Sequence, residues 1–133
     1  MPIKVKKLKP EFIDERGFIT RIIDQDKYPI RSVLYITGKA GTVRGNHYHK
    51  KDAHYIYCLA GKFRYSEKDI SKSNSKLESV LMEPGDLLLT KPKFFHMFEF
   101  LEESVFLAIT TESREQDKYE KGTVRMKVIP NEK

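Results

Sequence analysis

The chain contains 133 residues, of which 39% are hydrophobic and 33% are charged, and its formal net charge is +6. This length accommodates one domain with a substantial core and leaves no room for a second. The composition is too apolar for a disordered chain. Residues 1–133 are therefore predicted to form a single globular domain.

Targeting signals and cysteine usage point to the cytoplasm. No apolar run approaches the roughly 20 residues that span a bilayer, and the N-terminus "MPIKVKKLKPEF" lacks the apolar segment of a secretory signal. The single cysteine, Cys58, excludes a disulfide within the chain and suits a reducing compartment. We expect a cytoplasmic protein that does not contact the membrane.

The positive charge does not indicate a nucleic-acid partner. Most lysines are interspersed with acidic residues, as in "SEKDISKSNSK" and "SREQDKYEKG", which is typical of a solvated surface. The chain has no paired Cys/His finger and no aromatic strand of the RNA-binding type. The excess charge would favour an anionic ligand, although solubility explains it equally well.

Short segments with period-two patterning dominate the chain and predict strands, because they are rich in β-branched and aromatic residues and are separated by Gly or Pro. The polar stretch 66–76 is predicted to be a long hairpin loop, and 113–122 a single helical turn. So many strands in a small domain favour an all-β closed barrel or two-sheet sandwich with little or no helix. The predicted strands are 3–8, 18–23, 32–37, 54–60, 79–82, 86–90, 96–100, 104–110 and 123–129.

Three of the four histidines lie within eight residues, at positions 47, 49 and 54. In a strand, residues i and i+2 project from the same face, about 7 Å apart, so His47 and His49 form a natural pair of metal ligands. His54 follows the turn-like "KKDA" and lies near this pair if the chain doubles back. His96 is distant in sequence, so only the fold can bring it to the same place.

These spacings resemble the two sequence motifs of the cupin superfamily. The first motif runs Gly, five residues, His-x-His, three or four residues, Glu, six residues, Gly; residues 41–61 match each spacing, with His54 in place of the glutamate. Residues 85–100 resemble the second motif, although Pro92 falls one place later and Phe100 replaces the usual asparagine. The resemblance places all four histidines on the ligand positions of a cupin site and implies a small jelly-roll barrel.

Four imidazoles suit a divalent transition ion such as Zn, Fe, Mn, Ni or Cu. Each ring must be neutral to bind the ion, and its second nitrogen needs an orienting partner. In the alternative interpretation, these histidines are active-site or core groups that hold no metal. The predicted ligands are His47, His49, His54 and His96.

Two further segments narrow the resemblance. Residues 12–20, "FIDERGFIT", are similar to the Asp-x-Arg-Gly opening of the deoxysugar-nucleotide cupins, the dTDP-4-keto-6-deoxysugar 3,5-epimerases and 3,4-ketoisomerases. Residues 42–51, "TVRGNHYHKK", resemble the Arg-Gly-x-His segment of both groups, and the Cys-Leu-x-Gly at 58–61 is closer to the ketoisomerases. The sequence "GNHYH" also resembles the metal-binding cupin domain of capsular polysaccharide reductases.

The resemblance implies an isomerase or epimerase that moves protons beside the ketone of a nucleotide-activated 4-keto-6-deoxy sugar, for surface polysaccharide synthesis. His47 and His49 match the family's histidines, and either would be the base. Tyr48 is a candidate to return the proton.

The resemblance also implies how the substrate is held and how the chains assemble. Arg16 and Arg44 would bind the diphosphate, since a guanidinium fork suits phosphate oxygens, and Lys91 is a further candidate for substrate binding. By analogy with other cupins, the N-terminal segment "IKVKKL" pairs across a homodimer interface.

The metal and the base make competing demands on the same side chains. A histidine bound to a metal has no lone pair left to act as a base, and the metal-free ketoisomerases lack a histidine at the position of His54. Two alternatives therefore stay open: a metal-dependent cupin oxygenase with a four-histidine site, and a non-catalytic cupin that binds a metal or a sugar.

Overall fold

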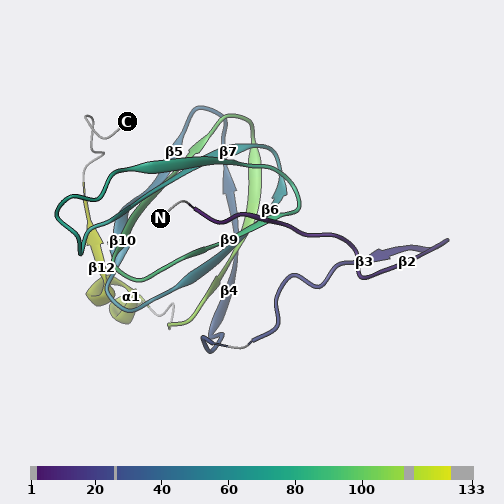
Figure 1. The fold of residues 1–133 in the computed structure, drawn as a ribbon, viewed down its shortest axis with the longest axis horizontal. Coiled ribbons are helices and arrows are strands. Elements are labelled where there is room, and N and C mark those ends of the chain that lie inside the picture. Colours follow the sequence, from purple (N-terminus) through teal and green to yellow (C-terminus); the bar gives the residue numbers. More distant parts are fainter. Residues whose placement is uncertain (1–2, 26, 113–115, 127–133) are drawn as a thin grey trace.

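The computed structural model of the chain describes residues 3–25, 27–112 and 116–126, with the backbone alone at 116–118. Two five-stranded antiparallel sheets form the body of the molecule (Figure 1). The first sheet has the order β1 (Lys6–Lys7), β9 (Asp86–Thr90), β6 (His54–Ala60), β11 (Ser104–Thr110) and β4 (Ser32–Gly38). The second has the order β12 (Thr123–Arg125), β5 (Val43–His49), β10 (Phe94–Phe100), β7 (Phe63–Asp69) and β8 (Glu78–Met82).

The core lies between the two sheets, and both contribute to it. Phe98 of β10 stacks on Phe106 of β11, with ring centroids 4.9 Å apart. Burying one such side chain stabilises the fold by about 1.5–3 kcal/mol. The buried cluster consists of Ile56, Cys58, Leu88, Phe106 and Ala108 from the first sheet and Phe63, Tyr65, Met82, Phe98 and Phe100 from the second.

The prediction of a single all-β domain with little helix is confirmed, while several element boundaries were wrong. The predicted strand 3–8 is paired only at Lys6–Lys7, and the predicted strand 18–23 ends at Ile19. Within the predicted loop 66–76, residues up to Asp69 belong to β7. This strand is polar because one face of the sheet is partly exposed, yet it is paired on both edges, with β10 and β8.

The C-terminal segment contains one short helix, α1 (Gln116–Gly122), inside the predicted helical stretch 113–122. Residues 113–115 of that stretch lie outside the described residues. The predicted strand 123–129 is observed as β12, which pairs with β5, and residues 127–129 are again outside the described part. Among the residues that the structure describes, no helix is long and apolar enough to cross a bilayer.

A two-stranded hairpin, β2 (Phe12–Asp14) and β3 (Gly17–Ile19), projects away from the body of the molecule (Figure 1). Its apolar side chains are largely uncovered: Ile13 is 70% exposed and Phe18 is 68% exposed. An isolated two-stranded hairpin is only marginally stable in water. Packing of its apolar side chains against another surface would stabilise it.

Strands β5 and β10 approach closely at a bulge that precedes the histidines. Gly45 and Asn46 both have positive φ, at 93° and 59°, and the β5–β10 register shifts between His96 and Met97. A Cβ at Gly45 would lie 2.8 Å from the carbonyl oxygen of His96. Only glycine combines this backbone conformation with this close approach, and the bulge sets His47 directly across from His96.

Candidate active site

The four histidines converge on one place inside the molecule, here called the histidine cluster. His47 and His49 come from β5, and His96 on the adjacent β10 is the cross-strand partner of His47. His54 comes from β6 in the facing sheet, not from a strand beside β5 as the doubling-back of the chain suggested. Ring centroids lie 4.7 Å apart for His47–His49, 4.8 Å for His47–His96 and 4.6 Å for His49–His54.

The hydrogen bonds of His49 fix its tautomer. The Thr123 hydroxyl donates its one hydrogen to the carbonyl oxygen of Tyr119 at 2.7 Å, so it accepts from Nδ1–H of His49 at 3.1 Å. The lone pair of the neutral His49 ring is therefore on Nε2. His49 is only 3% exposed, so this nitrogen acts in a largely dry environment.

The tautomers of His54 and His96 are fixed in the same way, because each bonds a group that can only accept. Nε2–H of His54 donates to a carboxylate oxygen of Asp52 at 2.8 Å, which leaves the lone pair on Nδ1. Nδ1–H of His96 donates to the carbonyl oxygen of Phe94 at 3.2 Å, which leaves the lone pair on Nε2. Three of the four rings thus have an orienting partner of the kind that metal ligands and general bases both require.

Asp52 is a buried anchor that the sequence analysis missed. Its Oδ1 accepts from the Thr111 amide at 2.9 Å, the Thr111 hydroxyl at 3.2 Å and the Glu112 amide at 3.1 Å, and its Oδ2 accepts from His54. Burial raises the pKa of Asp52, but the hydrogen bond and charge of His54 and the Thr111 amide outweigh it, so the pKa is lowered. The sequence signal was slight, an aspartate two residues before a histidine in a turn.

His96 is kept neutral by its surroundings. It is 2% exposed, and burial together with the charges of His47, His49 and His54 holds the pKa of His96 well below its usual range. The neutral ring is the form that both a metal ligand and a base need.

Three members of the cluster line an interior pocket of about 450 Å³: His47, His54 and His96. The rest of its wall is mostly apolar or aromatic, and Arg44 supplies its cationic group. Nε–H of Arg44 donates to the carbonyl oxygen of Thr37 at 2.8 Å, which orients the guanidinium. The other lining residues are Leu34, Tyr35, Ile36, Thr37, Gly45, Ile56, Phe98, Phe106, Ala108 and Tyr119.

Three predicted site residues lie elsewhere in this chain. Arg16 is at the turn of the projecting hairpin, where its Nε–H donates to Asp14 at 3.0 Å, far from the histidines (Figure 1). Tyr48 alternates with His47 and His49 along β5, so its side chain is on the opposite face and does not line the pocket. Lys91 lies outside the pocket as well, with Nζ 5.8 Å from the centroid of the Phe94 ring.

The arrangement of nitrogen atoms fits a transition metal, in two overlapping groups. One nitrogen each of His47, His49 and His96 lie within 4.8 Å of one another, and so do ligand atoms of His49, Asp52 and His54. His54, which is bonded to Asp52, belongs to the second set of ligand atoms, whereas His47 and His96 belong to the first. A set of three imidazoles is a common environment for Zn and similar ions, and in this set the rings of His49 and His96 are oriented by hydrogen bonds.

The fold and the paired histidine motifs define a cupin. The chain belongs to the family described as "FdtA: WxcM-like, C-terminal", whose family model matches residues 1–127. No curated protein matches the sequence.

Solved structures agree with this assignment. A double mutant of the 3,4-ketoisomerase QdtA from Thermoanaerobacterium thermosaccharolyticum, in complex with TDP, is 26% identical and has a TM-score of 0.72, with 92% of this chain and 86% of that chain covered. A 3,4-ketoisomerase from Helicobacter canadensis shares the fold at 20% identity and a TM-score of 0.72, covering 90% of each chain. A Legionella pneumophila 3,5-epimerase, in complex with dTDP-4-keto-L-rhamnose, also shares the fold at 18% identity and a TM-score of 0.74, covering 91% and 70%.

Replacing Asp52 by asparagine tests its role in fixing the tautomer of His54. The amide oxygen can keep the three hydrogen bonds of Oδ1, but the amide NH₂ then faces Nε2 of His54, which must become the acceptor. We expect the His54 proton to move to Nδ1, visible in the ¹⁵N shifts of the ring, and metal affinity or turnover to fall about 10- to 100-fold.

The matched control is Asp86→Asn, because Asp86 is equally buried but is bonded to Lys7, away from the histidines. An unchanged His54 spectrum in Asp52→Asn would contradict the assigned tautomer.

Proposed function

We propose that this protein is an isomerase or epimerase acting on a nucleotide-activated 4-keto-6-deoxy sugar. The observation that carries the proposal is the histidine cluster: His47, His54 and His96 line the largely apolar pocket, and hydrogen bonds fix the lone pairs of His54 and His96 there. Membership of the family and the TDP-bound neighbours support the class of substrate. One of these neighbours, a point mutant of the 3,4-ketoisomerase QdtA, was solved in complex with TDP-4-keto-6-deoxyglucose.

The chemistry is proton transfer beside the ketone. A base removes the acidic proton next to the carbonyl, and the resulting enediolate is reprotonated. Return of the proton to the other face of the same carbon gives epimerisation, and return to the neighbouring carbon moves the ketone. Imidazole suits both steps, because the neutral ring accepts the proton and the resulting imidazolium returns it, and the unperturbed pKa of histidine lies near neutral pH.

In this chain, His47 and His49 are the proposed bases. His47 lines the interior pocket, and Nε2 of His49 holds a lone pair because Nδ1–H is bonded to Thr123. For return of the proton, Tyr35 and Tyr119 replace Tyr48 as candidates, since both line the interior pocket and Tyr48 does not.

Arg44 is the proposed partner of the diphosphate, because a guanidinium oriented by Thr37 keeps its terminal nitrogens for phosphate oxygens. The apolar wall suits the 6-deoxy methyl group of the sugar. In a single chain, Arg16 and Lys91 are not placed to join Arg44.

We also propose a divalent transition ion, Zn, Fe, Mn, Ni or Cu, held by His47, His49 and His96. When bound, such an ion supplies a Lewis acid that polarises the keto and enolate oxygens. A ligating histidine cannot serve as the base. Proton transfer would then fall to His54, whose Nε2–H is bonded to Asp52, and to the pocket tyrosines.

A homodimer in the cytoplasm is the proposed state of the protein. Phe12, Ile13, Phe18 and Ile19 of the projecting hairpin are 50% to 70% exposed, and exposed apolar patches of this kind mark interaction surfaces. A second copy of the chain is the simplest cover for them. The buried free thiol of Cys58 suits the reducing cytoplasm.

Turnover is tested by incubating the protein with TDP-4-keto-6-deoxyglucose in D₂O and following the sugar protons by NMR. We expect either movement of the ketone to C3 or deuterium at C3 and C5, and a loss of about 100-fold or more in His49→Asn, the magnitude typical of a lost general base. The control is Tyr57→Phe, on a strand position that alternates with buried residues and lines no part of the pocket. Absence of any exchange with wild-type protein would reject the proposed activity.

Metal content is tested by elemental analysis of tag-free protein purified without chelators. About one transition ion per chain is expected, lost in His96→Gln and retained in Tyr57→Phe. No metal in the wild type would remove the metal from the proposal and leave all four imidazoles for acid–base work. Iron or manganese accompanied by oxygen consumption would instead favour the oxygenase alternative.

Assembly is tested by sedimentation velocity at micromolar concentration. We expect the wild type to sediment as a dimer of the 15.6 kDa chain. The variant Ile13→Ser/Phe18→Ser should sediment as a monomer, because it removes most of the apolar area that the hairpin offers. A monomeric wild type would overturn the proposed dimer.

A further inference from the structure

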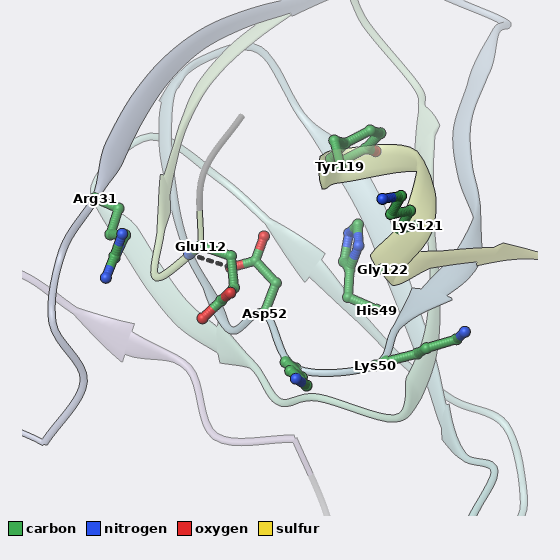
Figure 2. A pocket seen from close by; sticks show the side chains of 9 residues that line it. Arg31, His49, Lys50, Asp52, Glu112, Tyr119, Lys121 and Gly122 are labelled. Carbon is green, nitrogen blue, oxygen red and sulfur yellow. Dashed lines mark hydrogen bonds between the residues drawn. The ribbon is translucent and has the colours of Figure 1, made fainter. Parts of the chain in front are cut away.

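A second cleft lies on the α1 side of the histidine cluster, and we call it the α1 cleft. It has a volume of about 480 Å³ and lies between α1, the turn that links β5 to β6, and the residues next to β4 and β11 (Figure 2). Of the four histidines, only His49 lines it, whereas the other three line the interior pocket. Tyr119 lines both spaces, so the two meet at α1.

The α1 cleft gathers four cationic side chains: Arg31, Lys50, Lys51 and Lys121. Within the described part of the chain, none of them forms an ion pair. Arginines elsewhere are paired in the structure, such as Arg16 with Asp14, Arg21 with Glu11 and Arg125 with Glu120. Among the described residues, the cleft therefore gathers four cations that form no ion pair.

The two carboxylates of the α1 cleft do not cancel this charge. Asp52 already has partners within the protein, since its oxygens accept hydrogen bonds from Thr111, Glu112 and His54. Figure 2 shows the bond from the Glu112 amide to Asp52, which directs this carboxylate toward the strand end. Of the described residues that line the cleft, Glu112 is the remaining carboxylate, against four cations.

The walls of the α1 cleft are tied together by the backbone. The Lys50 amide donates to the carbonyl oxygen of Gly122 at 2.8 Å, which joins the β5–β6 turn to the end of α1. The Lys93 amide donates to the carbonyl oxygen of His49 at 2.8 Å. The backbone that carries Lys50 is therefore joined to the end of the helix that carries Lys121.

We propose that the α1 cleft is a phosphate-binding site beside the interior pocket; His49, a proposed base, lines the cleft, and Tyr119 lines both spaces. Lysines bind phosphate as point charges and arginine binds it through paired N–H groups, and the cleft supplies both. The phosphate belongs either to the diphosphate of the nucleotide sugar or to a second phosphate compound. A ligand here would contact α1, whose Tyr119 carbonyl orients Thr123 and, through it, His49.

The test is titration calorimetry at low salt with inorganic pyrophosphate, with TDP, and with pyrophosphate in the presence of saturating TDP. The cleft variant is Lys51→Gln/Lys121→Gln. The matched control is Lys9→Gln/Lys39→Gln, which removes the same charge from exposed lysines that line neither space. The third variant is Arg44→Gln in the interior pocket.

We expect the cleft variant to bind pyrophosphate at least about tenfold more weakly, as the loss of charge-assisted hydrogen bonds implies, and the control to bind as wild type does. Additive binding of pyrophosphate and TDP would identify a second phosphate compound. Competition, together with weakened TDP binding in the cleft variant, would assign the cleft to the substrate's own diphosphate.

No binding of pyrophosphate, an equal loss in the control, or a loss confined to Arg44→Gln would overturn the site. The D₂O exchange experiment on the same proteins separates this result from the proposed function. If the wild type exchanges sugar protons but fails the binding criteria, the isomerase proposal stands and the phosphate site is rejected. If it meets the binding criteria but exchanges no protons, the phosphate site stands and the isomerase proposal is rejected.

Discussion

The site depends on the burial of one carboxylate, Asp52, between the end of β11 and the start of β6. Removing an ionised carboxylate from water costs several kcal/mol unless partners replace the solvent. Two backbone amides, the Thr111 hydroxyl and the His54 ring supply that replacement, and bonds from His54 and the Thr111 amide lower the pKa of Asp52 against the effect of burial. The same bonds hold the β5–β6 turn in place and determine which nitrogen of His54 keeps its lone pair.

That constraint divides the histidine cluster into two kinds of group. His47, His49 and His96 come from adjacent strands of one sheet, and three of their nitrogens lie within 4.8 Å of one another. His54 approaches from the facing sheet, and its second nitrogen is bonded to a charged partner. The geometry therefore separates a three-nitrogen set on one sheet from a histidine on the facing sheet that is held by a carboxylate.

Local periodicity explains which parts of the site were predictable. The i, i+2 rule sets His47 and His49 on one face of β5, and this expectation holds, with their ring centroids 4.7 Å apart. The convergence of His96 and His54 depends on the β5–β10 register and on sheet-to-sheet packing. Sequence spacing reports neither, and only the likeness to cupin motifs anticipated them.

The differences between the predicted and the observed site residues have several causes. Arg16 was selected by its motif, and a motif does not say that its hairpin leaves the body of the chain. Tyr48 was selected by proximity in sequence, although alternation turns it away from its neighbours. Asp52 and Thr123 were missed because a short polar residue in a turn has many ordinary uses, and their importance comes only from long-range hydrogen bonds.

The histidine cluster lies between two spaces of opposite character. Among the described residues, the interior pocket is mostly apolar with one arginine, whereas the α1 cleft is lined by four cations that form no ion pair. The helix between them is seven residues long and is attached to the cluster through the contact from Tyr119 to Thr123 to His49. A change at α1 therefore reaches the ring nitrogen of His49 through two hydrogen bonds. This short connection is a physical route from the α1 cleft to the histidine cluster.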